Sequence, residues 1–246
     1  MSSWTDARID VGRDVEDVKA RRRWPAGSLL ARLPPDVRTE LLTRCRHVRF
    51  GPGEVLLRQG DTDRHAYVLL SGAVTVRVVD DGIEAVLAVR RPGDIVGELA
   101  ALTGEPRSAT VVAATDVLAG AVSGSAFVNI LTRHPQAAWE VVRTQAHRLE
   151  WANQRRVDFV SRRATPRVAR VLADLARDIA SSEERPIRIE LSQRELATIV
   201  GAALNTVENA LRQLARKGFI ERRYRAVLIT DLAGLTGFAD AESEKP

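Results

Sequence analysis

The sequence predicts an α+β fold in which a strand-rich N-terminal domain, one long helix and a helical C-terminal domain follow one another. Three observations predict it. Short runs of Val and Leu broken by Gly and Pro fill much of the first half, residues 136–163 contain neither Pro nor Gly, and two helix signals joined by a Gly-containing turn lie near the C-terminus. With 246 residues the chain is long enough for two domains that each bury a core.

The charge distribution indicates a polyanionic partner. The net charge is +5, and residues 161–230 hold 14 Lys and Arg against 8 Asp and Glu, whereas residues 1–160 hold 22 against 20. A basic excess in one region is typical of nucleic-acid binding. The single cysteine, Cys45, excludes an internal disulfide and, within one chain, a Cys-ligated iron–sulfur cluster or zinc site. With no leader and no apolar run long enough to span a bilayer, we expect a cytoplasmic protein without a membrane partner.

Residues 1–28 form a charged N-terminal extension, which we expect to be mobile or loosely docked. A phosphate-binding arm around Arg21-Arg22-Arg23 is the alternative. Residues 29–132 form the strand-rich domain, in which Leu29–Thr43 is predicted to be helical. The later runs are short and bounded by Gly and Pro, as in a small barrel or sandwich. These runs are Glu54–Arg58, Tyr67–Leu70, Ala73–Val79 and Ala85–Val89.

Residues 133–163 are expected to form one long helix, in which the stretch 136–163, without Pro or Gly, would span about 40 Å at about 1.5 Å per residue. Its apolar positions recur every three or four residues, which is the spacing of a coiled-coil seam. The seam consists of Val142, Ala146, Leu149, Asn153, Val157 and Val160. A long helix with such a seam needs a partner surface, so the sequence predicts a dimerisation helix and a homodimer.

Residues 164–234 form the C-terminal domain. The segment Ser192-Gln193-Arg194-Glu195 has the spacing of a capping box and begins a helix that ends at Gly201. A second helix runs from about Ala203 to Lys217 and is closed by Gly218. Two helices joined by a tight turn indicate a helix-turn-helix, and the apolar residues on both sides of the basic turn 222–225 indicate a hairpin wing. Residues 235–246 are assigned to a tail.

The most informative segment is the cassette Gly97-Glu98-Leu99-Ala100, followed by Pro106-Arg107-Ser108-Ala109-Thr110. A short turn or helix over 98–101 would direct backbone N–H groups at an anion. Arg107 supplies a permanently charged, bidentate clamp that suits a phosphate, and Glu98 supplies a carboxylate that can accept from a sugar hydroxyl. The alternative is a strand-rich domain that binds nothing, or another anion.

With this cassette, and with Gly60-Asp61 and Tyr67-Val68-Leu69 before it, the chain from about Leu29 to Thr230 resembles the cyclic AMP receptor protein/fumarate–nitrate regulator (Crp/Fnr) superfamily, in its cyclic-nucleotide-binding branch. The resemblance implies a cyclic-nucleotide-binding β-roll, a long dimerisation helix and a C-terminal winged helix-turn-helix. It implies a cyclic nucleotide as effector, with cAMP favoured and cGMP possible, and no metal. By the same resemblance, Glu98 would bind the ribose 2′-hydroxyl and Arg107 the cyclic phosphate. The other expected site residues are Gly97, Leu99 and Ala100 lining the site, Ser108 against the phosphate, and Thr110 packed nearby.

The chain departs from this family in the long helix. Residues near the middle of that helix face the purine in the family, and Ala152-Asn153 stands here where the cyclic AMP receptor protein has Thr-Ser. Asn153 can donate and accept, so it can read an adenine edge; setting the register of the dimer seam is the alternative. Ala152 can do neither, which leaves the identity of the base open.

A second departure lies in the recognition helix, where Ala203-Leu204-Asn205-Thr206-Val207-Glu208-Asn209 stands in place of the usual Ser-Arg-Glu-Thr-Val-x-Arg. Asn205 or Asn209 can bind adenine, and Leu204 can lie against a thymine methyl group. The DNA-binding residues expected from helix and wing are Ser192, Gln193, Ala203, Leu204, Asn205, Thr206, Asn209, Arg212, Lys217, Arg222, Arg223 and Arg225.

These features predict a cyclic-nucleotide-responsive transcription regulator rather than an enzyme, since the chain has no Walker loop, nucleophile elbow or kinase signature. Double-stranded DNA is the expected partner, with RNA polymerase as a further one. Ligand binding in the roll would act through the dimer helix on the orientation of the winged helices. Two alternatives stay open. One is a regulator whose roll is ligand-independent or senses another effector, and the other is a cyclic-nucleotide-binding protein whose helix-turn-helix is an interaction module.

Overall fold

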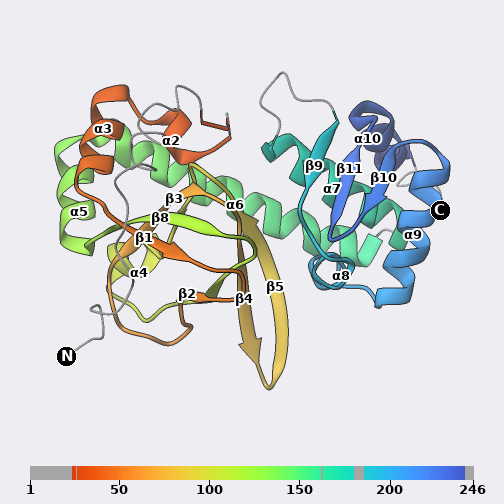
Figure 1. The fold of residues 1–246 in the computed structure, drawn as a ribbon, viewed down its shortest axis with the longest axis horizontal. Helices are drawn as coiled ribbons and strands as arrows, with labels where there is room; N and C mark the ends of the chain where they lie inside the picture. Colours follow the sequence, from red (N-terminus) through yellow and green to blue (C-terminus); the bar gives the residue numbers. More distant parts are fainter. Residues whose placement is uncertain (1–23, 26, 162, 180–185, 242–246) are drawn as a thin grey trace. The chain divides into compact units, whose positions relative to one another are not determined.

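The computed structural model describes residues 24–25, 27–161, 163–179 and 186–241. The chain divides into two units, Met1–Thr144 and Gln145–Pro246. The first unit is strand-rich and the second mainly helical, with α6 (Pro135–Ser161) contributing to both (Figure 1). The predicted α+β class is confirmed, as is the order of β-roll, long helix and helix-turn-helix. No helix in the described ranges is both long and apolar enough to cross a membrane.

The first unit holds two antiparallel four-stranded sheets, in the strand orders β1-β8-β3-β6 and β2-β7-β4-β5. Its strands are β1 (Arg46–Phe50), β2 (Val55–Leu57), β3 (Ala66–Ser71), β4 (Val74–Asp80), β5 (Ile83–Arg90), β6 (Ile95–Val96), β7 (Thr110–Ala113) and β8 (Val117–Val122). Its helices are α2 (Leu29–Arg32), α3 (Pro35–Thr43), α4 (Glu98–Thr103) and α5 (Gly124–Arg133), followed by the first turns of α6. The helical structure predicted for 29–43 is thus present.

Strand β3 is buried on both faces because it lies between two cores. Tyr67 and Leu69 belong to a core shared with residues of β2, β4 and β7 in the other sheet. Val68 and Leu70 belong to a second core, shared with residues of α2, α3 and α5. A strand that is covered on both sides carries apolar residues in a continuous run, which explains the unbroken apolar sequence after Ala66.

The end of the N-terminal extension is part of the fold. Trp24 is 8% exposed and belongs to the core that β3 shares with the helices. Ser28 caps α2 by accepting a hydrogen bond from the backbone N–H of Ala31. The loose docking expected for 1–28 is therefore wrong for Trp24 and Ser28, because a buried indole and a helix cap fix both residues. The run Arg21-Arg22-Arg23 lies outside the described residues.

The second unit contains a helix-turn-helix followed by a β-hairpin. Its elements after α6 are α7 (Ala164–Ile179), β9 (Ile187–Ile189), α8 (Gln193–Val200), α9 (Leu204–Arg216), β10 (Ile220–Arg223), β11 (Ala226–Ile229) and α10 (Leu232–Ala241). The three strands form one antiparallel sheet in the order β10-β11-β9. The predicted capping box is present, since Ser192 and Glu195 exchange side-chain and backbone hydrogen bonds. Gly201 ends α8 with φ +68°, in the left-handed region that glycine adopts without strain.

Helix α10 extends into the stretch 235–246 that the sequence assigns to a tail. Leu235 and Ala239 are buried, and Arg170 of α7 pairs with Asp240 at 2.5 Å. The backbone N–H of Gly234 donates to the carboxylate of Asp231, which precedes the helix. An apolar face against α7 and an acidic residue at the helix start together account for the helix.

Helix α6 presents large apolar side chains to solvent. Trp139 is 70% exposed and Val142 55%; further along, Leu149 is 62% exposed and Val157 57%. The last three belong to the predicted seam, in which the side chain of Val160 is outside what the structure describes. An apolar stripe of this kind on one helix is typical of an interaction surface.

Candidate functional site

Arg107 lies in the loop between α4 and β7, and only 3% of its surface is exposed. Two backbone hydrogen bonds fix it against the loop that follows β2. Its N–H donates to the carbonyl oxygen of Asp61 at 2.8 Å, and its carbonyl oxygen accepts from the N–H of Gly60 at 2.9 Å. The loop after β2 and the loop after α4 are therefore joined at Arg107, and its backbone position is fixed.

The Arg107 guanidinium forms a bidentate pair with Asp63. Its Nε donates to Oδ1 at 3.1 Å and its Nη2 to Oδ2 at 3.0 Å. It also donates from Nη1 to the carbonyl oxygen of Gly97 at 2.7 Å, and from Nη2 to that of His65 at 2.5 Å. Parallel N–H···O bonds between a guanidinium and a carboxylate are among the strongest side-chain contacts. Asp63 is a site residue that the sequence did not single out.

The carboxylate of this ion pair and the neighbouring His65 both have shifted pKa values. Burial raises the pKa of Asp63, but the hydrogen bond from Arg107 and the nearby positive charges outweigh burial, so that the pKa is lowered. Burial lowers the pKa of His65 to about 4, although Asp63 acts in the opposite direction. Nδ1 of His65 lies close to Oδ2 of Asp63. The ring also lies edge-on to Tyr67, with centroids 4.8 Å apart.

Helix α4 begins at the cassette. Gly97 is its N-cap with φ +78°, and a Cβ there would stand 2.6 Å from Nη1 of Arg107, so only glycine fits. The Glu98 side chain is buried, and Ala100 is buried too, whereas Leu99 is 43% exposed. The structure thus brings Gly97, the start of α4 and Arg107 together, as the sequence predicts.

The remaining cassette residues are less enclosed. Ser108 is exposed, and the hydroxyl of Thr110 accepts from the backbone N–H of Gln59 at 3.0 Å, so Thr110 holds the neighbouring loop. Ala152 and Asn153 are exposed residues of α6 within the second unit. The contacts of Ser108, Ala152 and Asn153 with a nucleotide stay predictions.

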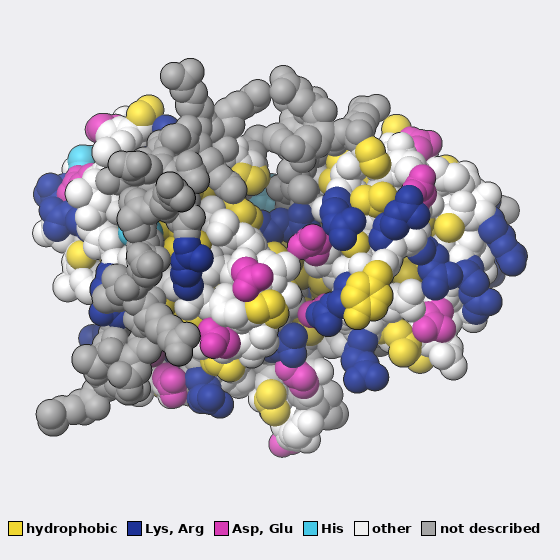
Figure 2. All heavy atoms as spheres, viewed as in Figure 1, with side chains coloured by type: hydrophobic (Ala, Val, Ile, Leu, Met, Phe, Trp, Pro, Cys, Tyr) yellow, Lys and Arg dark blue, Asp and Glu magenta, His cyan; other side chains and the backbone are white. Residues whose placement is uncertain are grey.

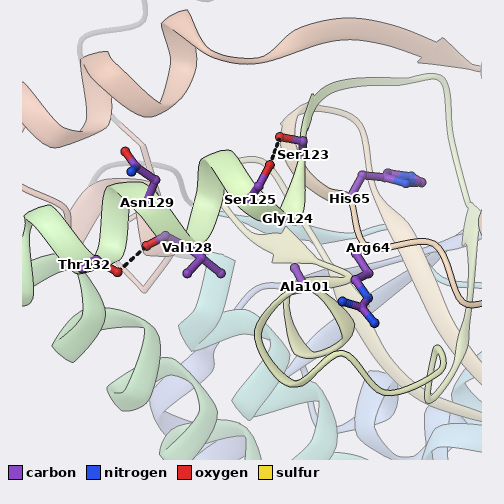
Figure 3. A pocket seen from close by; sticks show the side chains of 9 residues that line it. All are labelled: Arg64, His65, Ala101, Ser123, Gly124, Ser125, Val128, Asn129 and Thr132. Carbon is purple, nitrogen blue, oxygen red and sulfur yellow. Dashed lines mark hydrogen bonds between the residues drawn. The ribbon is translucent and has the colours of Figure 1, made fainter.

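An open pocket of about 710 Å³ is lined by Arg64, His65, Ala101 and residues of 123–132. Figure 3 shows its lining, with the α5 residues Ser125, Val128 and Asn129 on one side and Arg64 on the other. None of the cassette residues lines it. His65, whose carbonyl oxygen accepts from Arg107, also lines the pocket, so the pocket adjoins the surroundings of Arg107. Among the residues that the structure describes, no three His, Cys, Asp or Glu side chains are grouped to hold a metal ion.

In the second unit, α9 has one buried and one exposed face. Val207, Leu211 and Leu214 are buried, whereas Asn205 and Asn209 point to solvent. Of the residues expected to bind DNA, those exposed are Ala203, Leu204, Asn205, Asn209, Arg212, Lys217, Arg222, Arg223 and Arg225, and those half-buried are Ser192, Gln193 and Thr206. Figure 2 shows several Lys and Arg side chains over the region of α8, α9 and the hairpin.

Two contacts distinguish residues within this surface. The Asn209 amide oxygen accepts from Arg212, whereas no such neighbour engages Asn205 among the hydrogen bonds of the described residues. Oriented with its nitrogen toward Glu208, the Gln193 amide donates to that carboxylate at 3.1 Å and accepts from Arg222 of the wing at 3.1 Å. Gln193 therefore connects α8, α9 and β10. Glu208, which this amide contacts, was not among the residues that the sequence analysis expected on this surface.

The hairpin turn is basic and exposed. Tyr224 at its tip is 90% exposed, and Arg225 adopts φ +49°. Arg223 pairs with Glu221 at 2.5 Å, and the ammonium of Lys217 lies 5.2 Å from the centroid of the Phe238 ring. Arg222, which binds Gln193, is thus the wing residue tied most directly to the helix-turn-helix.

Two family models match the chain. Residues 47–134 match the cyclic nucleotide-binding domain, and residues 166–238 match the Crp-like helix-turn-helix domain. The first match covers the cassette and Asp63, and the second covers α8, α9 and the hairpin. The two matched domains therefore coincide with the two regions whose geometry is described above.

The similar proteins are transcription regulators, not enzymes. A CRP-like cAMP-activated global transcriptional regulator of Mycobacterium tuberculosis is 30% identical over 200 residues, which cover 80% of this chain and 89% of that protein. The cAMP-activated global transcriptional regulator CRP of Salmonella typhimurium is 25% identical, over 76% of this chain and 91% of its own length. A solved structure of a CRP/FNR-family regulator from Thermus thermophilus aligns with a TM-score of 0.63 at 29% identity, over 80% of this chain and all of that one.

Proposed function

This chain belongs to the Crp/Fnr family of transcription regulators, and on that premise we propose that its β-roll binds a cyclic nucleotide and that its winged helix binds double-stranded DNA. Binding in the roll changes the affinity for DNA through α6. Cyclic AMP is the favoured effector and cyclic GMP the second choice. A cytoplasmic location and contacts with RNA polymerase remain predictions.

The burial of Arg107 beside the start of α4 supports the ligand more than any other observation. A guanidinium that is 3% exposed is held in a domain interior only when acceptors surround it, and a cyclic phosphate offers two acceptors in the same geometry as the carboxylate of Asp63. The buried side chain of Glu98 stands one residue from Gly97 and supplies an acceptor for a ribose hydroxyl. Arg107 therefore holds the phosphate and Glu98 the sugar.

The exposed face of α9 supports DNA binding with an altered sequence preference. Asn205 presents both an acceptor and a donor, the pattern that pairs with N6 and N7 of adenine. Leu204, 37% exposed, fits a thymine methyl group. The wing arginines contact phosphates, which set affinity and salt dependence rather than sequence. We therefore expect a half-site rich in A·T pairs at the positions that these residues reach.

The exposed apolar stripe of α6 supports a homodimer. In a dimer, α6 precedes each winged helix directly, so a ligand that changes the packing of the two α6 helices changes the spacing of the two α9 helices. The ligand shifts this equilibrium only by its difference in affinity for the two dimer states. Asn153, at the seam position after Leu149, is the residue expected to meet the base.

One observation favours a second candidate function. Because Asp63 already pairs with Arg107, the roll is electrostatically satisfied without a ligand. A regulator whose roll is ligand-independent, or senses another effector, has the same fold. Its DNA affinity would not change when cyclic nucleotide is added.

The test is calorimetric titration of the purified protein with cAMP and cGMP, together with DNA binding at one fixed salt concentration. Arg107→Ala is expected to abolish binding of the nucleotide. Because Arg107 is buried, Glu98→Gln serves as a second variant that keeps the ion pair and weakens binding through the ribose. Arg64→Ala is the matched control, since it removes a neighbouring guanidinium that lines the adjoining pocket. No heat with either nucleotide and unchanged DNA affinity would support the ligand-independent regulator instead.

A further inference from the structure

We propose that Asp63 is an internal counter-ion that competes with the ligand phosphate for Arg107 and so sets the affinity of the β-roll for anionic ligands. The inference rests on the proposed function, because it concerns the same site. It adds a residue that neither the cassette nor the family match assigns to the site.

The hydrogen bonds of Arg107 carry the inference. A guanidinium has five N–H groups. Four of them are engaged. The N–H of Nε and one N–H of Nη2 donate to the Asp63 carboxylate. The second N–H of Nη2 donates to the His65 carbonyl oxygen, and one N–H of Nη1 donates to the Gly97 carbonyl oxygen. A phosphate that takes two parallel N–H groups must therefore take the pair that Asp63 holds.

The charges around Arg107 also indicate that the ligand phosphate must displace Asp63. The pair of Arg107 and Asp63 has no net charge, and the lowered pKa of Asp63 keeps its carboxylate ionised at neutral pH. His65 is neutral at that pH because its pKa is about 4. An anion that enters thus meets a neutral pair instead of an isolated cation, and it gains attraction only after the carboxylate moves away.

Burial shows which partner can move. The Arg107 side chain is 2% exposed, whereas the Asp63 side chain is 24% exposed. Asp63 belongs to the loop between β2 and β3, so rotation about its side-chain bonds brings the carboxylate into water. Arg107 stays in place, fixed by its backbone bonds to Gly60 and Asp61. Ligand binding is then an exchange in which one anion leaves the guanidinium as another arrives.

The exchange predicts that removing the negative charge at 63 tightens ligand binding. Asp63→Asn keeps the size of the side chain and an oxygen acceptor but removes the charge. We expect its cAMP dissociation constant to fall at least fivefold from the wild-type value. Asp61→Asn is the matched control, because Asp61 carries the same charge in the same loop but binds Arg107 only through its backbone carbonyl oxygen. The dissociation constant of this control is expected to stay within twofold of wild type.

A second ligand separates this inference from the proposed function. Inorganic phosphate tests whether Arg107 becomes available to an anion. This test does not depend on whether the site accepts a nucleotide. We expect phosphate to raise the melting temperature of Asp63→Asn more than that of wild type or Asp61→Asn. Asp63→Ser, with a shorter neutral side chain, is measured alongside in case Asp63→Asn does not fold.

The outcomes are distinct. Tighter cAMP binding by Asp63→Asn, with Asp61→Asn unchanged, supports the competition. If no protein binds cAMP but phosphate stabilises Asp63→Asn alone, Asp63 masks Arg107 and the proposed cyclic-nucleotide effector is wrong. If wild type binds cAMP and the neutral variants bind it equally or more weakly, Asp63 is no competitor, and the proposed function stands without it. If wild type does not bind cAMP, and the folded neutral variants bind neither cAMP nor phosphate, both proposals fail.

Discussion

Gly97 lies so close to Arg107 that a Cβ on the glycine would stand 2.6 Å from Nη1 of the arginine. The same Cβ would stand 2.7 Å from a methyl group of Leu57. Gly97→Ala is therefore expected to push the guanidinium out of its place. The left-handed backbone at φ +78° adds a cost of about 1–3 kcal/mol for a residue with a Cβ. We predict a lower melting temperature and loss of nucleotide binding, measured by thermal denaturation and calorimetry.

Gly53→Ala is the control for that experiment. Gly53 has φ +86°, yet nothing lies within 4 Å of a Cβ built on it. This substitution carries the backbone cost without the clash. If Gly97→Ala and Gly53→Ala lowered stability equally and both bound nucleotide, the close contact with Arg107 would not matter.

Acid is expected to destabilise the protein through His65. Its pKa is about 4 in the folded chain, where burial disfavours the charged ring, and about 6.5 when unfolded. Between these values the unfolded chain binds more protons, so the stability present above about pH 6.5 is lost as the pH falls toward 4. The loss from this group is at most about 3 kcal/mol. The lowered pKa of Asp63 acts in the same direction, but only below its unfolded value of about 4.

Denaturant unfolding at several pH values measures this effect. His65→Gln is expected to flatten the dependence of unfolding free energy on pH between 6.5 and 4. His147→Gln changes an exposed histidine of α6 and serves as the control. An unchanged slope in His65→Gln would show that other groups bind the protons.

The parts of the site that the sequence predicted are those that depend on neighbouring residues. The short helix that begins at Glu98 and the capping box at Ser192 are set within one helical turn, so nearby residues are sufficient to find them. The continuous apolar run of β3 and the seam of α6 are likewise patterns of nearby residues. These signals located both functional regions.

The parts that the sequence did not predict depend on contacts between distant segments. Asp63 and Arg107 are separated by 44 positions, and an aspartate in a polar loop carries no sign of its partner. The burial of Trp24 depends on a core that closes around it, and the link from Gln193 to Glu208 joins two helices. Such pairs become visible only once the chain is folded.

The two asparagines of α9 are expected to differ in DNA binding. Asn205 is exposed, whereas the amide oxygen of Asn209 is engaged by Arg212. Asn205→Ala should therefore weaken the free energy of DNA binding by about 1–3 kcal/mol at one adenine position, which is the contribution of a bidentate base contact. Asn209→Ala should weaken DNA binding less. The measurement is selection of DNA sites followed by binding to single-base variants at fixed salt. Equal losses for the two substitutions would contradict the difference drawn from Arg212.

The proposed dimer depends on the seam of α6, in which Leu149 is 62% exposed, more than Val142 or Val157. Leu149→Glu places a carboxylate where two helices would meet, and an unpaired buried charge costs several kcal/mol. We predict that the dimer dissociates at least 100-fold more readily, measured by sedimentation at a series of concentrations. His147→Glu introduces the same group about 200° around the helix and should leave the dimer intact. A dimer that survives Leu149→Glu but not His147→Glu would mean that a different face of α6 forms the interface, and the coupling between roll and winged helix would then follow that face.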